Sequence, residues 1–324
     1  QSKNLKQSEK FSILNSMQFT TPVNIKPNKS IDHNSRIVML GSCFAENIGK
    51  KLIDCGFNVV MNPMGILYNP ISIHSALKRI TEDREITEDE LFYHNGLWAS
   101  FMHHGSFSHS DKNEALRMMN DRLHQAHEQL QNATHLIITF GSAEVYEHNN
   151  QVVANCHKLP ARQFTHRLLT TNEITTPYYS LFPAPYSLLP IFTISPVRYL
   201  SESAHHGQIN KATLLLATDQ ICRETGANYF PSYEIMMDEL RDYRYYATDM
   251  IHPSEVAINY IFERFTKTYL TEEAIRTAEE IKKIKKSLSH RPLHPDSTEY
   301  QKFQQKLSQQ INTITKKYPN IKLT

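Results

Sequence analysis

The amino-acid sequence predicts an α/β protein, a three-layer α/β/α sandwich around a mainly parallel five-stranded sheet. Short apolar runs alternate with longer amphipathic segments along most of the chain, and glycine or proline separates many of them. This alternation is typical of βαβ units, in which helices cover both faces of a parallel sheet. With 324 residues, the chain is long enough to bury a substantial core.

The predicted strands are short apolar runs bounded by turn residues. Ile37–Leu40 is the first of them, and Gly41 ends it. Runs of this length and composition are typical of strands that are buried on both faces of a sheet. The expected strands cover residues 37–40, 57–61, 135–140, 191–196 and 228–231.

The predicted helices lie between these strands and after the last one. In one of them Leu116, Met119 and Leu123 share a face at helical spacing. Gly56 and Gly226 follow two of the segments, where glycine is the preferred residue for ending a helix. The expected helices cover residues 44–55, 72–81, 112–132, 211–225 and 254–270.

Other stretches depart from the alternation. Residues 1–16 form a polar N-terminal extension, residues 17–270 the α/β domain, and residues 271–324 a charged helical C-terminal tail. Residues 91–109 are rich in aromatic residues and histidine and are expected to be irregular. The proline-rich connection 142–189 is too long for an ordinary βα loop, so we expect it to form a wall of the site.

Charge and cysteine content narrow the function classes. A net charge of +2 gives no global basic face, so we expect no nucleic-acid partner. The four cysteines form no C-x-x-C pair, which argues against a disulfide framework or a structural zinc site and fits a reducing, cytoplasmic compartment. No apolar run reaches membrane-spanning length, so we expect no membrane association.

One pair of histidines has the spacing of metal ligands. His124 and His127 stand three residues apart in a predicted helix, which places them on one face. A zinc site needs at least a third protein ligand, and the sequence offers none beside them. The sequence therefore predicts no metal site.

The most informative stretch follows the first strand. Ser42 and Cys43 place a hydroxyl and a thiol where the next helix begins, and the helix macrodipole favours a thiolate there. Cysteine is the stronger nucleophile near neutral pH, because the pKa of its thiol falls at helix N-termini and beside histidine. Serine needs full help from a general base. We favour Cys43 as the nucleophile, with Ser42 as the alternative or as a helix N-cap.

The string Gly-Ser-Cys-Phe-Ala at residues 41–45 resembles the GSCFA family, which is named for these five residues. The string Asn-Cys-His-Lys at residues 155–158 is also typical of that family. The family looks like a branch of the SGNH, or GDSL-type, esterase superfamily, in which Gly-Asp-Ser ends the first strand and the Ser attacks an ester. The resemblance implies a flavodoxin-like SGNH fold, with Cys43 at the position of the nucleophile.

Asp249-Met250-Ile251-His252-Pro253 resembles the final motif of the same superfamily, in which the histidine is the general base. Three residues before it, the aspartate can reach the imidazole in a turn and fix its tautomer. The resemblance implies that His252 is the base and that Asp249 orients it.

An acyl-transfer site also needs donors for the oxyanion. The superfamily uses the amide of the nucleophile, a glycine after the second strand and an asparagine in a Gly-x-Asn motif after the third. Gly65 and Gly141 match the two glycines, but Ala143 stands where the asparagine is expected. Losing one such donor typically lowers turnover by about 10²- to 10³-fold, so we expect slow hydrolysis unless another group replaces it.

Four other residues are candidates for binding the substrate. Asn155 could supply the missing amide, and His157 or Lys158 could bind an anionic group; a structural turn is the alternative for this segment. Arg198 follows the fourth strand and suits a carboxylate or phosphate ligand, unless it is simply solvated.

The predicted function is that of an SGNH-like hydrolase or acyltransferase acting on an ester, with a carbohydrate-linked ester as the favoured substrate, through an acyl-enzyme on Cys43 or Ser42. One alternative is a glycan O-acyltransferase with coenzyme A as acyl donor, and another is a catalytically idle carbohydrate-binding module. No bound cofactor is expected, and the partner is a small-molecule or glycan ester. The sequence does not predict an oligomeric state.

Overall fold

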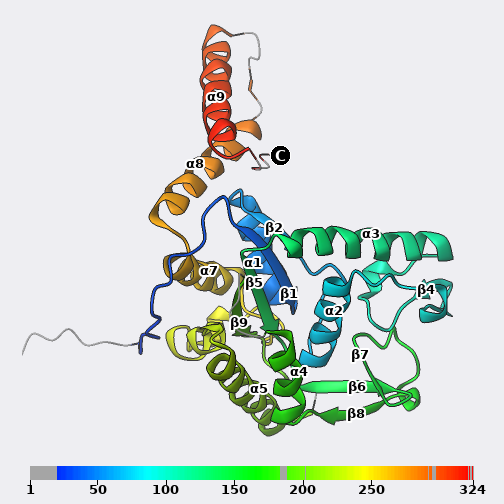
Figure 1. Ribbon diagram of the computed structural model, residues 1–324. Coiled ribbons are helices and arrows are strands. Elements are labelled where there is room, and N and C mark those ends of the chain that lie inside the picture. The colour runs from blue at the N-terminus through cyan, green and yellow to red at the C-terminus, as the bar shows by residue number, and fades with distance from the viewer. Residues whose placement is uncertain are drawn as a thin grey trace, which may run out of the picture.

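The structure, a computed structural model, describes residues 20–182, 188–200, 202–290, 292–293, 297–319, 321 and 323. The predicted N-terminal extension, residues 1–16, lies outside them. A five-stranded sheet occupies the centre of the molecule, in the order β10-β9-β5-β1-β2, and all its strands are parallel (Figure 1). The strands are β1 (Arg36–Gly41), β2 (Asn58–Met61), β5 (His135–Phe140), β9 (Leu189–Ile194) and β10 (Asn228–Phe230). The predicted α/β class is confirmed.

Helices cover both faces of this sheet because successive strand residues point to opposite sides. Val38 and Ile138 belong to one core cluster and Ile37 and Ile137 to the other. The first cluster is closed by α2 (Pro70–Glu82), α3 (Lys112–Gln131), α4 (Thr171–Leu181) and α5 (Ala204–Thr225). The second is closed by α1 (Cys43–Asp54), the π-turn Ile235–Glu239 that follows α6 (Ser232–Glu234), α7 (Glu255–Tyr269) and the start of α8 (Glu272–Leu288).

The turn from β1 into α1 is tightly packed against β5. Gly41 has φ +139°, and a Cβ there would lie 2.2 Å from the carbonyl oxygen of Thr139. Its amide donates to Oδ1 of Asn62 at 2.9 Å. Only glycine fits such an approach of two backbones. Cys43 therefore stands at the first residue of α1, at the carboxyl edge of the sheet.

Two regions in which no strand was predicted contain short strands. The connection 142–189 folds into an antiparallel sheet of β6 (Glu144–His148), β7 (Gln151–Val153) and β8 (Thr165–Leu168), followed by α4. Residues 91–109 contain the hairpin of β3 (Phe92–His94) and β4 (Leu97–Ala99). These strands have three to five residues each, too few for a periodic signal. Single 3₁₀ turns complete the fold at Glu88–Glu90, Gly105–Phe107, Ala161–Gln163 and Tyr243–Tyr245.

Helix α5 begins seven residues before its predicted start. Ser203 caps its N-terminus, accepting a hydrogen bond from the amide of His206 at 3.0 Å. The segment 204–210 carries two histidines, a glycine and polar residues, so it lacks the apolar spacing that signals a helix. Its packing, not its own pattern, makes it helical.

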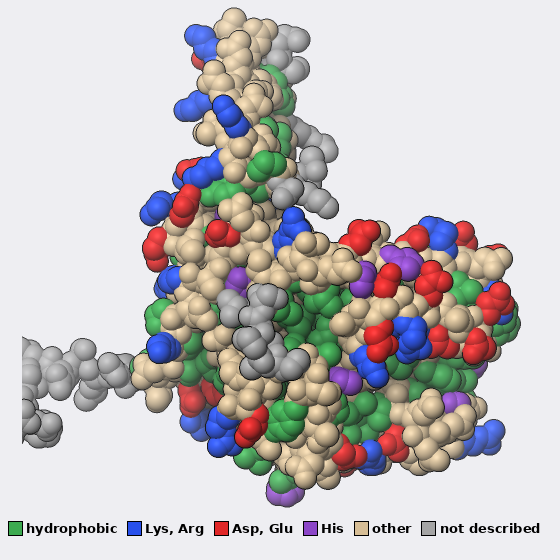
Figure 2. Space-filling model, in the orientation of Figure 1, with side chains coloured by type: hydrophobic (Ala, Val, Ile, Leu, Met, Phe, Trp, Pro, Cys, Tyr) green, Lys and Arg blue, Asp and Glu red, His purple; other side chains and the backbone are tan. Residues whose placement is uncertain are grey.

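The C-terminal tail is helical, as predicted, and consists of α8 and α9 (Thr298–Lys317). Ala274 and Ala278 of α8 pack into the main core, whereas Ile281 and Ile284 form a separate cluster with Leu307 of α9. Figure 1 shows these helices rising away from the body of the molecule. Acidic and basic side chains intersperse over the face shown in Figure 2. Among the described residues, no helix has the length and apolar character required to cross a membrane.

Candidate active site

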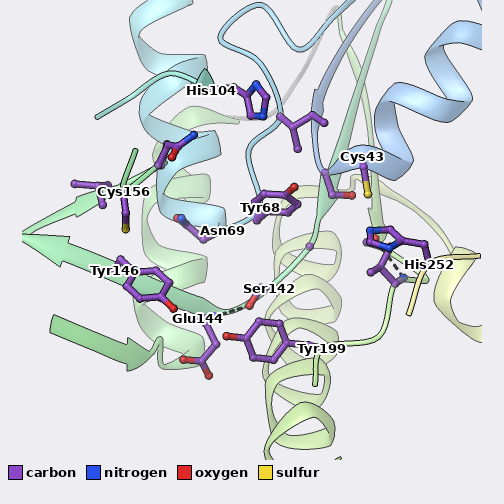
Figure 3. Close-up of a pocket in the computed structure, with 18 of the residues that line it drawn as sticks. Cys43, Tyr68, Asn69, His104, Ser142, Glu144, Tyr146, Cys156, Tyr199 and His252 are labelled. Carbon is purple, nitrogen blue, oxygen red and sulfur yellow. Dashed lines mark hydrogen bonds between the residues drawn. The ribbon is translucent and has the colours of Figure 1, made fainter. Parts of the chain in front are cut away.

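A cavity of about 550 Å³ lies at the carboxyl ends of the sheet strands. Ligand sites of open α/β sheets form at this edge, because the loops after the strands converge there. Residues from five loops line the cavity: Ser42 and Cys43 after β1, Tyr68 and Asn69 after β2, Gly141 and Ser142 after β5, Arg198 and Tyr199 after β9, and His252 before α7 (Figure 3).

The loop before α7 brings Asp249 and His252 into contact. Oδ2 of Asp249 lies 2.7 Å from Nδ1 of His252, while Oδ1 accepts hydrogen bonds from the amides of Ile251 and His252, both at 2.9 Å. These interactions hold the pKa of the Asp249 carboxyl at about 2. Asp249 thus shapes the turn and also fixes the imidazole. Nε2 is the ring nitrogen left to act as a base.

Arg198 holds this loop in place. Its amide donates to the carbonyl of Ile251 and its guanidinium to the carbonyl of Met250, both at 3.1 Å. The guanidinium also lies 5.7 Å from the ring centres of Tyr243 and Tyr246. Arg198 lines the cavity, as expected for a substrate ligand, but its contacts show that it is also a support for the His252 loop.

The structure separates Ser42 from Cys43. Ser42 is 1% exposed, and its hydroxyl caps α1 by accepting from the amide of Phe44 at 3.3 Å. Cys43 is half-buried and is the first helical residue. In Figure 3 the Cys43 sulfur and the His252 ring lie on the same side of the cavity. The geometry therefore gives Ser42 a capping role and favours Cys43 for chemistry.

The thiol of Cys43 differs from the sequence expectation in one respect. Burial raises its pKa, and the backbone amides of Phe44 and Cys43 and the charge of Lys211 oppose the rise without overcoming it. The expected lowering at a helix N-terminus is therefore wrong for this thiol. A protonated thiol needs a base to become a nucleophile, which gives His252 a defined task.

Lys211 is a buried cation that the sequence did not indicate. It is 3% exposed, and its Nζ donates to the carbonyls of Gly141 and Ser195, each at 2.9 Å. Both carbonyls belong to residues that line the cavity. Burial lowers the pKa of Lys211 to about 7, and interaction with the Cys43 thiolate opposes this shift. The ammonium thus lies under the cavity floor and interacts electrostatically with the nucleophile.

We predict that Lys211→Met moves the pH midpoint for iodoacetamide alkylation of Cys43 upward and slows alkylation at pH 7 by about 3- to 10-fold. The physical reason is the loss of a buried positive charge that favours the thiolate. Lys50→Met is the matched control, since Lys50 is exposed on α1 and pairs with Glu46 at 2.6 Å. An unchanged midpoint in folded Lys211→Met protein would contradict the interaction.

The two glycines expected in the oxyanion hole have engaged amides. The amide of Gly65 donates to the carbonyl of Asn62, and that of Gly141 donates to the carbonyl of Tyr68, both at 2.8 Å. Gly65 is also outside the cavity lining. Its role is conformational, because it has φ +83° and a Cβ there would lie 2.2 Å from the Cβ of His104. Neither amide is free to bind an oxyanion in this arrangement.

Two asparagines offer amide donors to the cavity instead. Oδ1 of Asn155 accepts from the amide of His157, and Oδ1 of Asn69 accepts from the amide of Ser72, each at 2.8 Å. Because the oxygens are committed, the NH₂ groups are the donors that remain. Both residues line the cavity. Sequence reasoning found Asn155 but missed Asn69, whose place before Pro70 signalled only a turn.

The neighbours of Asn155 have different surroundings. His157 Nε2 lies 2.8 Å from the carbonyl oxygen of Ser100, and burial lowers the pKa of His157. Lys158 is exposed, and neither residue lines the cavity. The structure therefore does not bring His157 or Lys158 to the site as anion ligands. Cys156 does line the cavity, and burial raises the pKa of its thiol.

The far part of the cavity is lined by an acidic side chain that no sequence pattern signalled, and a histidine outside the lining contacts it. Glu144 and Tyr146 of β6 line this part of the cavity, and Glu144 contacts His206, 62 residues away along the chain.

The pair His124 and His127, noted in the sequence for its spacing, does not line this cavity. His124 contacts Asp83 and Glu85, and Nδ1 of His127 lies 2.8 Å from the carbonyl oxygen of Ile80.

Comparison with known proteins identifies the family. The model of the GSCFA family matches residues 36–265, which carry the sheet, Cys43, Asp249 and His252. A second model, described as the C-terminal domain of GSCFA domain proteins, matches residues 281–324. No curated protein and no solved structure matches the chain. Since the first match spans more than half of the chain, the chain belongs to the GSCFA family.

Proposed function

We propose that this protein is an ester hydrolase or acyltransferase that works through an acyl-enzyme on Cys43. The observation that carries the proposal is the pairing of His252 with Asp249 at 2.7 Å in a loop that lines the same cavity as Cys43. A nucleophile and a base that line one cavity, with a carboxylate that orients the base, are the parts of an acyl-transfer site. The resemblance of the Gly-Ser-Cys turn and the Asp-x-x-His motif to SGNH esterases supports the same chemistry.

The reaction has two steps. His252 Nε2 accepts the thiol proton while the Cys43 sulfur attacks the ester carbonyl carbon, and the leaving alcohol then takes the proton from the imidazolium as its C–O bond breaks. In the second step His252 takes a proton from water or an acceptor hydroxyl, whose oxygen attacks the thioester carbonyl; the C–S bond breaks, and the imidazolium returns the proton to the departing sulfur. Water gives an acid, and a hydroxyl gives a new ester.

The cavity walls favour a hydroxyl-rich substrate such as a carbohydrate ester. Tyr68, Tyr146 and Tyr199 line it, and tyrosine combines an apolar face with a polar tip. The NH₂ groups of Asn69 and Asn155 can donate to hydroxyl or carbonyl oxygens. Apolar walls with a few placed polar groups are the usual composition of small-molecule sites.

An acylation assay tests the proposal. On treatment with p-nitrophenyl acetate, we expect an acetyl mass increment on Cys43 that water removes slowly and a sugar or amine acceptor removes faster. Slow hydrolysis is expected because the oxyanion donors are incomplete, with Ala143 in place of an asparagine. Absence of any adduct and any turnover would instead favour an idle binding module. An adduct that only water discharges would exclude the transferase form.

A further inference from the structure

Two histidines and two glutamates form a closed cluster, of which Glu144 lines the cavity. Nε2 of His206 lies 2.5 Å from Oε1 of Glu144, and Nε2 of His166 lies 3.0 Å from Oε2 of the same carboxylate. The Nδ1 atoms of the two rings lie 3.3 and 3.4 Å from the carboxylate of Glu202. Figure 3 places Glu144 and Tyr146 away from Cys43 and His252.

Three different elements deliver these side chains. Glu144 begins β6 directly after the Gly141-Ser142 turn, His166 lies on β8, and His206 lies in the first turn of α5. The carboxylate of Glu144 is 3% exposed, which is rare for glutamate unless it is paired. The ring of His166 is stacked on Tyr146, with centres 4.5 Å apart. The cluster is therefore held by packing as well as by charge.

From this geometry we infer that Glu144, His166 and His206 form a binding site for a divalent transition-metal ion of the zinc class, with Glu202 as the outer carboxylate. The Nε2 atoms of both rings face the carboxylate of Glu144, so one ion there can take both imidazoles and a carboxylate oxygen as ligands. The Nδ1 atoms face Glu202, the position that a second-shell carboxylate takes beside metal-bound histidines. One ligand atom each of Glu144, His166 and Glu202 lie within 4.8 Å of one another, and His206 joins this group through its contact with Glu144. Binding of the ion by both imidazoles requires their side chains to rotate toward it.

Two histidines and one glutamate form a ligand set that zinc uses in catalytic sites, where a fourth position stays open. Because Glu144 and Tyr146 line the cavity, the proposed site borders the space in which a substrate would lie. An oxygen donor, such as a hydroxyl or carboxylate of the bound molecule, is the ligand this position suits. The site does not depend on the proposed chemistry of Cys43.

Titration with the metal alone tests the inference. Full-length protein is treated with a chelator, dialysed and titrated with ZnCl₂ in a calorimeter. We expect one ion per chain with a dissociation constant below about 10 μM. The double variant His166→Ala/His206→Ala should lose at least about 100-fold in affinity. Glu202→Gln keeps the three ligands and should lose about 10- to 100-fold, the usual effect of removing an outer-shell partner.

The matched control is His124→Ala/His127→Ala, which removes two histidines elsewhere, one of them also in contact with two carboxylates, Asp83 and Glu85. Its affinity should equal that of the unmodified protein. Circular dichroism checks folding, and Glu144→Gln replaces the double variant if that one does not fold. Failure to saturate with Zn²⁺, or equal affinities in both double variants, would overturn the site.

Discussion

Replacing His252 with alanine is expected to slow acylation of Cys43 at pH 7 by about 10²- to 10⁴-fold, the usual contribution of a positioned general base. The effect is large because burial raises the pKa of the thiol, so little thiolate forms without a base. Stopped-flow release of p-nitrophenol, together with the mass of the acyl-enzyme, measures the rate. His104→Ala is the control, because His104 lines the same cavity while its Nδ1 contacts the hydroxyl of Ser106 at 3.0 Å.

The pH dependence of the acylation rate separates the role of His252 from that of Asp249. The pKa of the Asp249 carboxyl is about 2, so this group stays ionised over the working range. As pH rises, the thiolate forms unaided, so His252→Ala should regain part of its lost rate. A deficit that is equal at pH 7 and pH 10 would contradict a general-base role.

Asp249→Asn is expected to lower the acylation rate about 10- to 100-fold at pH 7. An asparagine can still accept from the amides of Ile251 and His252, so the turn survives, but it removes the charge that orients and stabilises the imidazolium. The effect is smaller than that of a buried triad aspartate because the Asp249 side chain is 45% exposed. Asp242→Asn is the control, since Asp242 caps a turn in the same region by accepting from the amide of Arg244.

Cys43→Ala is expected to abolish the acyl-enzyme, leaving at most the background reaction of the ester with surface groups. Ser42→Ala should retain the adduct, because Ser42 acts as a helix cap, and should cost about 1 kcal/mol in the free energy of unfolding. Intact-protein mass spectrometry and urea denaturation measure the two effects.

Cys156→Ala is the matched control for the nucleophile, because its thiol lines the same cavity and burial raises its pKa as well. This variant should form the adduct at the rate of the unmodified protein. Turnover retained in Cys43→Ala and lost in Ser42→Ala would establish a serine esterase and overturn the assignment.

Much of the site was predictable because local patterns carry it. Three of these patterns each span only a few consecutive residues: the strand before Gly41, the turn Ser42-Cys43 and the Asp-x-x-His motif. Short-range backbone geometry decides how the residues within each pattern are placed. The parallel sheet followed from alternation of apolar strands and amphipathic helices, since each element buries one kind of surface. The strands of β6, β7 and β8 escaped prediction because three to five residues are too few for a period.

Other features depended on contacts that the chain makes only when folded. The burial that raises the pKa of Cys43 comes from the surrounding elements and outweighs the local effect of a helix N-terminus. Spacing along the sequence does not show that Lys211 donates to the carbonyl of Gly141, 70 residues away, or that the amide of Gly41 donates to Oδ1 of Asn62, 21 residues away.

The sequence by itself determined the α/β class, the family, and the turn that places a thiol at the carboxyl edge of the sheet. Only the tertiary structure decided which hydroxyl or thiol is exposed, that the amides of Gly65 and Gly141 are engaged, and that Glu144 meets His166 and His206. The physical reason is that hydrophobic periodicity and turn chemistry depend on residues close together in the sequence. The burial and charge pairing of a side chain depend on every element packed around the site.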